Sequence, residues 1–235
     1  QLPQQTPPHG RACSRAFLMS SGQRLANPFE RRGFEGPTVV LLGNVGMGKS
    51  TVLEKVTGVS GYSSDSSVSF TRASTAIVTE CGRLRLIDTP GGNSMEDKFN
   101  HNVWIAHALN LCPVSLILVV VKADTRIDNT VGLVRDHVER FADFSDMLGV
   151  CVTHMDLVTW QQDELLNYIQ NELGITAVVF VGKNTPGENI LKATLILCTR
   201  AHDIMITSDN FLKYFKISND NVKIQGAPPY SADPP

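Results

Sequence analysis

The sequence predicts an α/β fold in which helices cover both faces of a mainly parallel central sheet. Short runs rich in β-branched residues alternate with helix-length amphipathic stretches, and such alternation is typical of a parallel sheet with crossover helices. The expected strands are Thr38–Leu42, Ala76–Thr79, Leu84–Ile87, Leu116–Lys122, Gly149–Thr153 and Val178–Val181. The expected helices lie near residues 49–57, 97–111, 129–142, 160–173 and 187–203.

Several of these helices carry local signals for where they start, stop and pack. Thr159–Gln162 and Thr185–Glu188 both fit the capping-box pattern, so we expect the two threonines to cap helices. Gly174 follows Leu173 at a point where a helix stop is expected. In the helix near 129–142 one apolar stripe should face the core, and its members are Val131, Val134, Val138 and Phe141.

Length and composition favour one domain with an extension at each end. The chain has 235 residues, 42% of them apolar, which is enough to bury a full core. We expect a flexible extension over residues 1–36, a domain over 37–206 and a partly disordered extension over 207–235, because both ends are rich in proline. An apolar cluster after residue 206 either closes the core, which we favour, or docks on a partner; its members are Phe211, Leu212, Tyr214 and Phe215.

Charge and cysteine content exclude several classes of protein. The formal net charge of −2 gives no overall basic footprint, so we expect no nucleic-acid partner. The longest apolar run, Val114–Val121, is much shorter than the roughly 18 residues of a membrane helix. The cysteines are isolated, without the paired spacing of a zinc site, and are expected as small core residues in a reducing, cytoplasmic compartment. They are Cys13, Cys81, Cys112, Cys151 and Cys198.

The strongest motif is Gly-Asn-Val-Gly-Met-Gly-Lys-Ser over residues 43–50, between an expected strand and an expected helix. It matches the glycine-rich phosphate loop, whose main-chain N–H groups form an anion-binding concavity at a helix N-terminus. Lys49 would supply a positive charge to the β- and γ-phosphates, and the Ser50 hydroxyl would bind Mg²⁺. The expected phosphate-contacting residues are Gly43, Asn44, Val45, Gly46, Met47, Gly48, Lys49, Ser50 and Thr51.

A second motif, Asp88-Thr-Pro-Gly91, follows the strand that ends near Ile87, about 40 residues after the phosphate loop. We expect Asp88 to orient Mg²⁺, through water, and the Gly91 N–H to reach the γ-phosphate. A turn without function is the alternative, since Thr-Pro-Gly-Gly forms turns on its own. This order of motifs favours the nucleotide site.

The loop over residues 61–75 lies between these two motifs. A loop that senses the γ-phosphate needs a hydroxyl residue that binds Mg²⁺ only in the triphosphate state. We expect Thr71 to bind both the metal and the phosphate side of the nucleotide, with Thr75 and Ser74 as alternatives.

A third motif, Cys151-Val-Thr-His-Met-Asp156, predicts which base is bound. The strand delivers Thr153, His154 and Asp156 to its carboxyl end, where such sheets bind ligands. The Asp156 carboxylate can accept N1–H and the 2-amino group of guanine, and adenine lacks both donors in that arrangement. His154 would stack on the base. Gly182 and Lys183 would contact it through main-chain N–H groups, and the alternative for these two residues is an ordinary strand-to-helix turn. The alternative for Asp156 is a simple cap of the next segment.

The five elements in this order resemble the motif series of the translation-factor class of GTPases. Asp88–Gly91, Leu111–Lys122 followed by Arg126, and Val152–Leu157 further resemble the immunity-associated nucleotide-binding GTPase family, relatives of septins and of chloroplast import-receptor GTPases. The resemblance covers roughly residues 37–201. It implies a P-loop GTPase fold, GTP and GDP as ligands, slow GTP hydrolysis, and nucleotide-dependent self-association as a homodimer or oligomer through the nucleotide face, often at intracellular membranes.

The sequence departs from the family pattern at two positions. Thr153-His-Met-Asp156 replaces the usual Asn/Thr-Lys-x-Asp, which puts the packing role of the lysine in doubt and keeps the carboxylate. Gly92 stands where many small GTPases carry a glutamine that orients the attacking water, so no catalytic residue is identified. A partner across a dimer would then supply that function. Three hypotheses remain: a slow GTPase switch, a non-hydrolysing GTP-dependent scaffold, and an ATPase or kinase, which Asp156 disfavours.

Overall fold

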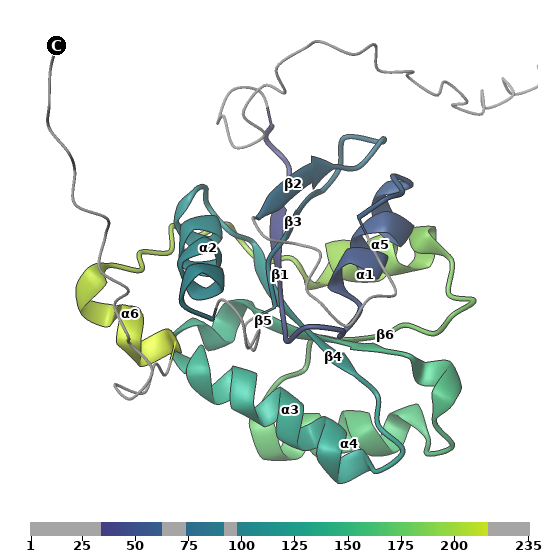
Figure 1. Ribbon diagram of the computed structural model, residues 1–235. Coiled ribbons are helices and arrows are strands. Elements are labelled where there is room, and N and C mark those ends of the chain that lie inside the picture. The colour runs from purple at the N-terminus through teal and green to yellow at the C-terminus, as the bar shows by residue number, and fades with distance from the viewer. Residues whose placement is uncertain (1–33, 63–73, 92–97, 216–235) are drawn as a thin grey trace, which may run out of the picture.

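The computed structural model describes residues 34–62, 74–91 and 98–215, and within them the chain forms one six-stranded sheet in the order β2-β3-β1-β4-β5-β6 (Figure 1). The strands are β1 Thr38–Leu42, β2 Thr75–Val78, β3 Arg85–Asp88, β4 Leu116–Lys122, β5 Leu148–Thr153 and β6 Val178–Phe180. The pair β2–β3 is antiparallel, and the other four pairs are parallel. The predicted α/β class with a mainly parallel sheet is therefore confirmed.

The central strands are continuous apolar runs because both faces of the sheet are covered. Every residue of β1 is buried, and so are the first six residues of β4. Successive residues point to opposite faces. Val40, Leu42 and Val119 therefore belong to one core, whereas Val39 and Leu41 belong to the other.

Helices complete the two cores, one on each face of the sheet (Figure 1). The core that contains Val40 is covered by α2, α3, α4 and α6, and the core that contains Val39 by α1 and α5. The helices are α1 Lys49–Thr57, α2 Lys98–Asn110, α3 Ile127–Arg140, α4 Gln162–Leu173, α5 Gly187–Leu197 and α6 Ser208–Phe215, with short 3₁₀ turns η1 Ala142–Met147 and η2 Met155–Leu157. This three-layer arrangement leaves the carboxyl ends of the parallel strands for the loops that form the site.

Helix ends agree with the sequence prediction only in part. Gly174 is the left-handed C-cap of α4, as predicted. The two predicted capping boxes are wrong, because α4 begins after Gln161 and α5 after Pro186, and neither start has a side-chain cap. The Thr185 hydroxyl instead accepts a hydrogen bond from the Gly182 N–H at 2.8 Å. Packing and loop contacts outweigh the local capping signal at both places.

Helix α5 ends at Leu197, earlier than predicted, because Cys198 adopts an extended conformation. The following segment lies along the sheet, where the N–H of Thr199 donates to the Ser115 carbonyl and His202 forms a bridge with Val114. Asn110 of α2 holds the same segment with two hydrogen bonds to the main chain of Ile206, at 2.7 and 2.8 Å. These contacts hold the segment between α5 and α6 against α2 and the residues just before β4.

Helix α6 belongs to the packed body, so the compact part of the chain continues beyond the boundary expected at residue 206. Phe215 and Tyr214 are buried, and the rings of both lie about 6 Å from Phe141. The Tyr214 hydroxyl donates to Asp143 at 2.8 Å, and Lys213 pairs with the same carboxylate. Phe211 is partly buried and also packs against this core, whereas Leu212 is 58% exposed, so the core interpretation holds for three members of the predicted cluster and fails for Leu212.

The described cysteines differ in burial. Cys112 and Cys151 are buried as predicted, Cys198 is half-buried, and Cys81 is exposed. The prediction of a core residue is wrong for Cys81, which lies exposed in the turn between β2 and β3. Cys13 lies outside the described residues.

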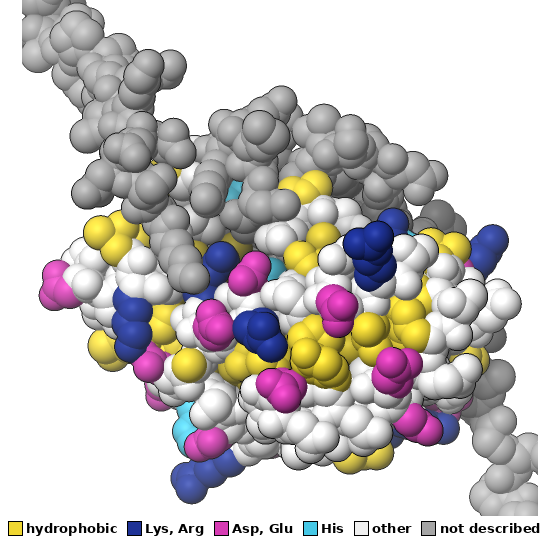
Figure 2. Space-filling view, turned by 90° about the horizontal axis from the view of Figure 1, so that it is seen from below, with side chains coloured by type: hydrophobic (Ala, Val, Ile, Leu, Met, Phe, Trp, Pro, Cys, Tyr) yellow, Lys and Arg dark blue, Asp and Glu magenta, His cyan; other side chains and the backbone are white. Residues whose placement is uncertain are grey.

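The outer surface mixes side-chain types. Seen from below, on the side of α3 and α4, lysine and arginine side chains are interspersed with aspartate and glutamate around hydrophobic ones, so neither sign of charge dominates this face (Figure 2). Each helix within the described part of the chain is too short or too polar to span a lipid bilayer.

Candidate nucleotide-binding site

The phosphate loop connects β1 to α1 at the carboxyl edge of the sheet. Gly48, the residue before α1, has φ 88°, a left-handed conformation that glycine adopts without strain. Among the described side chains, none caps this helix start. The main-chain N–H groups of the first turn therefore face the loop, where an anion is stabilised by them and by the helix dipole.

Lys49 lies buried within the loop, 7% exposed. Its Nζ donates to the carbonyl oxygens of Gly43 at 3.0 Å and Asn44 at 2.9 Å. Burial lowers the pKa of Lys49 from 10.5 to about 8, and the nearby Asp88 carboxylate opposes this shift. The loop thus holds an ammonium group that is poorly solvated and gains from any anion that binds beside it.

Ser50 in the first turn of α1 and Asp88 at the end of β3 lie in contact. The Ser50 hydroxyl donates to Asp88 Oδ2 at 2.7 Å, and Asp88 is 1% exposed. A hydroxyl and a carboxylate are the hard oxygen ligands that Mg²⁺ prefers. Within the described residues no group of three or more His, Cys, Asp or Glu side chains forms a protein-only metal cage. The donor set therefore fits a Mg²⁺ ion that completes its coordination with phosphate and water.

The segment after Asp88 packs directly on the phosphate loop. The Thr89 hydroxyl donates to the Leu41 carbonyl at 2.6 Å, which joins this segment to β1. A Cβ atom on Gly91 would lie 2.5 Å from the main-chain nitrogen of Val45 and 2.7 Å from its Cα. Only glycine fits there, and the close approach places the Gly91 main chain beside the loop that would hold the phosphates.

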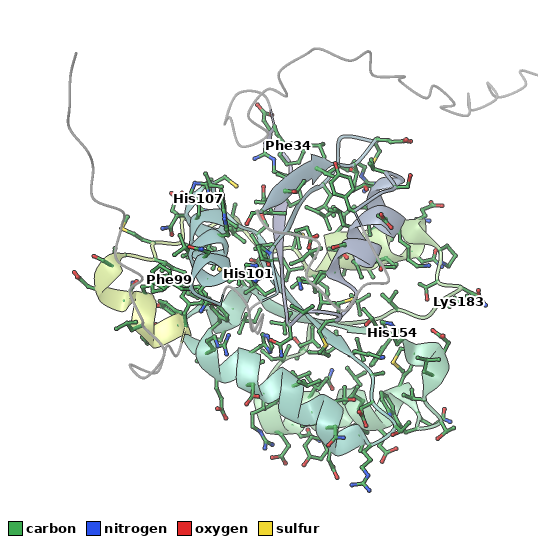
Figure 3. The ribbon with its side chains drawn as sticks, in the orientation of Figure 1. Phe34, Phe99, His101, His107, His154 and Lys183 are labelled. Carbon is green, nitrogen blue, oxygen red and sulfur yellow. The ribbon has the colours of Figure 1, made fainter. Side chains whose placement is uncertain are left out.

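The residues predicted to read the base line one open cavity of about 400 Å³. Its walls come from α1, the end of β5 and the loop after β6, and its lining residues are Gly48, Thr51, Val52, Lys55, Thr153, His154, Asp156, Val181, Gly182 and Lys183. Figure 3 places His154 and Lys183 near each other at this side of the molecule. The cavity begins at the phosphate loop, so a ligand can occupy both places at once.

Thr153 links the base side of the cavity to the phosphate loop. Its hydroxyl donates to the Met47 carbonyl at 2.8 Å and lies 2.8 Å from Nδ1 of His154. His154 has φ 58°, a left-handed conformation that is uncommon outside glycine and that often occurs at functional sites. Partial burial lowers the pKa of His154, and Lys122 adds to this effect. Both effects favour the neutral form of the ring, and the nearby Asp156 carboxylate opposes them.

Asp156 is exposed and ionised. Its Oδ1 accepts a hydrogen bond from the Lys183 N–H at 2.6 Å, and this bond lowers the pKa of the carboxyl group. Lys55 of α1 contacts the same loop, since its Nζ donates to the carbonyls of Lys183 at 2.8 Å and Thr185 at 3.2 Å. The carboxylate and the loop after β6 therefore form one preorganised unit.

A family model for 50S ribosome-binding GTPases matches residues 38–172, which is more than half of the chain. The chain belongs to this GTPase family. The matched residues include the phosphate loop, the Asp88–Gly91 segment and Asp156, so the geometry described above lies in the nucleotide-binding domain of a P-loop GTPase. A comparison with curated protein sequences gave no match.

Solved structures share the fold of this GTPase domain. NFeoB from S. thermophilus bound to GDP.AlF4⁻ and K⁺ is 19% identical, with a TM-score of 0.53 over 69% of this chain and 62% of that one. An NFeoB mutant bound to GMPPNP is also 19% identical, with a TM-score of 0.53 over 74% and 68%. A dimerization-deficient mutant of Toc33 from Arabidopsis thaliana is 17% identical, with a TM-score of 0.55 over 72% and 88%. The chain thus spans less than two thirds of the first of these structures.

The GTPase domain brings together most of the residues predicted for the nucleotide site. Thr71 and Gly92 lie outside the described residues. Of the alternatives to Thr71, Ser74 donates its hydroxyl to the Trp104 carbonyl at 3.0 Å, and Thr75 lies in β2. The N–H groups of Gly182 and Lys183, predicted to contact the base, already have the partners Thr185 and Asp156.

Two residues of this region were missed by the sequence analysis. Lys55 braces the loop after β6, and His101 of α2 lies 2.9 Å from the Gly91 carbonyl through Nδ1. Neither belongs to a motif, and Lys55 is 128 residues from its partner Lys183. Only the fold makes these contacts visible.

Proposed function

We propose that the chain binds GTP and GDP with Mg²⁺ and hydrolyses GTP slowly as a nucleotide-dependent switch. The observation that carries the proposal is that a buried lysine, a paired hydroxyl and carboxylate, and a carboxylate-rimmed cavity lie in sequence along one edge of the sheet. These three groups match the three parts of the ligand: triphosphate, metal and base.

The triphosphate would lie in the loop over residues 43–51. Main-chain N–H groups of the first turn of α1 would surround the β-phosphate, and Lys49 would leave its two carbonyl partners to contact the β- and γ-phosphates. The Gly91 N–H would reach the γ-phosphate, which the close packing of Gly91 on Val45 supports. Only the triphosphate form makes this last contact.

Ser50 and Asp88 would hold Mg²⁺, with Thr71 as the proposed third residue in the triphosphate state. The 2.7 Å contact between Ser50 and Asp88 supports the pairing of their oxygens. A magnesium ion bound there neutralises charge on the β- and γ-phosphate oxygens. The protein side of the site would orient the phosphates, with the Asp88 carboxylate near the Lys49 ammonium group.

Guanine would occupy the cavity between α1 and the loops after β5 and β6. Asp156 is ionised and its Oδ1 is held by the Lys183 N–H, so its second oxygen would accept hydrogen bonds from donors on the base. His154 would cover one face of the ring. This arrangement favours guanine over adenine, because adenine offers no N1–H and no 2-amino donor to the second oxygen of Asp156.

Slow hydrolysis follows from the sequence at residue 92. A glycine there has no side chain to orient the attacking water. We propose that a second copy of the chain, docked across the nucleotide face, supplies the missing group. A solved Toc33 structure, named for a dimerization-deficient mutant, shares the fold and supports this kind of assembly. Membership of the immunity-associated branch, and action at intracellular membranes, stay proposals that rest on the sequence resemblance.

The first test identifies the nucleotide that the purified chain carries. Denaturing the protein and separating the released nucleotides by chromatography should yield GDP or GTP. Recovery of ADP or ATP at equal or greater amount would contradict guanine selectivity and favour an ATPase or kinase. Asp156→Ala provides the control, because the variant should carry much less guanine nucleotide while it keeps the phosphate loop.

The second test separates the switch from a non-hydrolysing scaffold, which Gly92 favours as the alternative. Single-turnover GTP hydrolysis is measured over a range of protein concentrations, with Lys49→Ala as the control for contaminating activity. A slow rate that rises with concentration supports hydrolysis assisted by a partner copy. GTP that stays intact at every concentration while the protein assembles supports the scaffold.

A further inference from the structure

Helix α2 is bonded to both segments that flank the expected γ-phosphate position. His101 contacts the Gly91 carbonyl through Nδ1 at 2.9 Å, and one turn later the Trp104 carbonyl accepts the Ser74 hydroxyl at 3.0 Å. Gly91 is the third residue after β3, and Ser74 directly precedes β2. In Figure 3 His101 lies between α2 and the central strands, whereas His107 lies at the far end of the same helix.

The hydrogen bond between His101 and Gly91 has a fixed direction. A carbonyl oxygen accepts, so Nδ1 of His101 carries the hydrogen. The side chain is 4% exposed, so water does not compete for the carbonyl from that side. The imidazole therefore fixes the peptide group that follows Gly91 with a single, buried donor.

Gly91 is held from the opposite side as well. Its Cα faces Val45 so closely that a Cβ atom would lie 2.7 Å from the Val45 Cα. Val45 belongs to the phosphate loop, and Gly91 is therefore clamped between that loop and His101. A main chain held at both sides presents its N–H group in one place, which reduces the entropy lost when a ligand binds.

We propose that His101 is a positioning residue for the γ-phosphate: it holds Gly91 against the phosphate loop and couples helix α2 to the triphosphate state. This inference rests on the proposed function, because it assumes that the Gly91 N–H meets the γ-phosphate. His101 itself does not touch the nucleotide. Its hydrogen bond contributes to the difference in affinity between GTP and GDP. Because His101 lies on α2, a change at the γ-phosphate also reaches α2, whose Trp104 carbonyl accepts the Ser74 hydroxyl.

The affinity test compares three variants of the full chain with GDP and with the non-hydrolysable analogue GMPPNP, both with Mg²⁺. His101→Ala removes the donor and should weaken GMPPNP binding about tenfold, the effect of one buried hydrogen bond, with GDP binding unchanged. His101→Asn should restore GMPPNP affinity, because its amide nitrogen occupies the place of Nδ1. His202→Ala is the matched control, since His202 is an exposed histidine whose contacts are made by its main chain.

The coupling test uses tryptophan fluorescence. The chain contains two tryptophans, and Trp104 lies on α2. In a Trp160→Phe background, Trp104 emission should differ between the GDP and GMPPNP complexes in the parent and in His101→Asn. The difference should disappear in His101→Ala. Emission that still responds to the γ-phosphate in His101→Ala would contradict the coupling.

The outcomes separate this inference from the proposed function. If the parent chain binds neither nucleotide, the proposed function fails. If the parent binds both and His101→Ala loses GDP and GMPPNP affinity equally, or loses neither, only the role of His101 is overturned. Thermal melting of each variant shows whether it is folded. If His101→Ala is unfolded, the test passes to His101→Asn, which retains the hydrogen-bond donor. A folded His101→Asn that binds GMPPNP about tenfold more weakly than the parent, with GDP binding unchanged, would also overturn the role of His101.

Discussion

Lys49 is the residue on which the phosphate site depends. Two carbonyls of its own loop hold the ammonium group, and burial lowers its pKa to about 8. The group is thus less well solvated than a surface lysine, and a phosphate that replaces the carbonyls would restore a strong charge partner. Binding should therefore raise the pKa of Lys49.

The affinity for GDP should depend on pH because of this shift. Below about pH 8 Lys49 is charged in the free and the bound protein, so affinity is constant. Above about pH 8 the free protein loses the proton while the complex keeps it, so affinity should fall, approaching tenfold per pH unit.

Calorimetric titration of GDP at pH 7, 8 and 9 measures this dependence. Repeating the pH 9 titration in buffers of different ionisation enthalpy should reveal proton uptake on binding. Lys49→Ala should bind weakly and show neither effect. A GDP affinity that stays constant to pH 9 in the parent chain would exclude a titrating lysine at the phosphates.

The proposed role of Asp156 predicts how its substitution changes base preference. Asp156→Asn replaces one carboxylate acceptor by an amide donor, which suits the 2-oxo group of xanthine better than the 2-amino group of guanine. GDP binding should weaken by about tenfold or more, and XDP should bind better than GDP. Competition between the two nucleotides on the same variant measures the preference. Retained preference for GDP would remove Asp156 from the base site.

Single residues of the site were predictable where a motif names them. The motifs name Ser50 and Asp88 as residues of one magnesium site, and their side chains lie 2.7 Å apart, while the metal itself stays a prediction. His101 and Lys55 were not predictable, because their partners Gly91 and Lys183 are chosen by the packing of separate elements. A motif predicts the main-chain geometry around a ligand. The contacts that hold that main chain in place come from residues distant in sequence, so the motif does not predict them.

At the scale of elements, the central strands were the most predictable part of the fold. Strands β1 and β4 are continuous apolar runs, because they are buried on both faces, and their predicted bounds are the observed ones. Helix starts were less predictable. Thr159 and Thr185 satisfy a capping pattern, yet the helices start two or more residues later, because the loops that precede them are fixed by contacts elsewhere.

Helix α6 was missed as an element, although its core contacts were expected. An eight-residue helix is too short to show a periodic pattern, and packing stabilises it. Phe215→Ala should therefore lower the free energy of unfolding by about 3–5 kcal/mol, the usual cost of deleting a buried phenylalanine. Leu212→Ala on the same helix is the control, and it should change stability by less than about 0.5 kcal/mol because Leu212 is 58% exposed.

Urea unfolding of the two variants measures both values. Equal, small effects of Phe215→Ala and Leu212→Ala would mean that α6 does not belong to the cooperative core. The compact domain would then end near residue 206, as the sequence alone suggested.

At the scale of the whole molecule, the sheet order explains why distant motifs form one site. Strands β3, β1, β4 and β5 are neighbours and parallel, so the segments that follow β1, β3 and β5 all emerge at one edge. The phosphate loop, Asp88 and Asp156 come from these three segments. The NFeoB and Toc33 structures share the fold that produces this arrangement.

Calorimetric titration of the nucleotide-free 235-residue chain with GDP and with ADP, both with Mg²⁺, tests guanine-nucleotide binding most directly. GDP should bind at one site per chain, ADP should give no measurable heat under the same conditions, and Lys49→Ala should greatly weaken GDP binding. A folded chain that takes up no GDP, or that takes up ADP equally well, would contradict the assignment of this edge of the sheet to a guanine nucleotide.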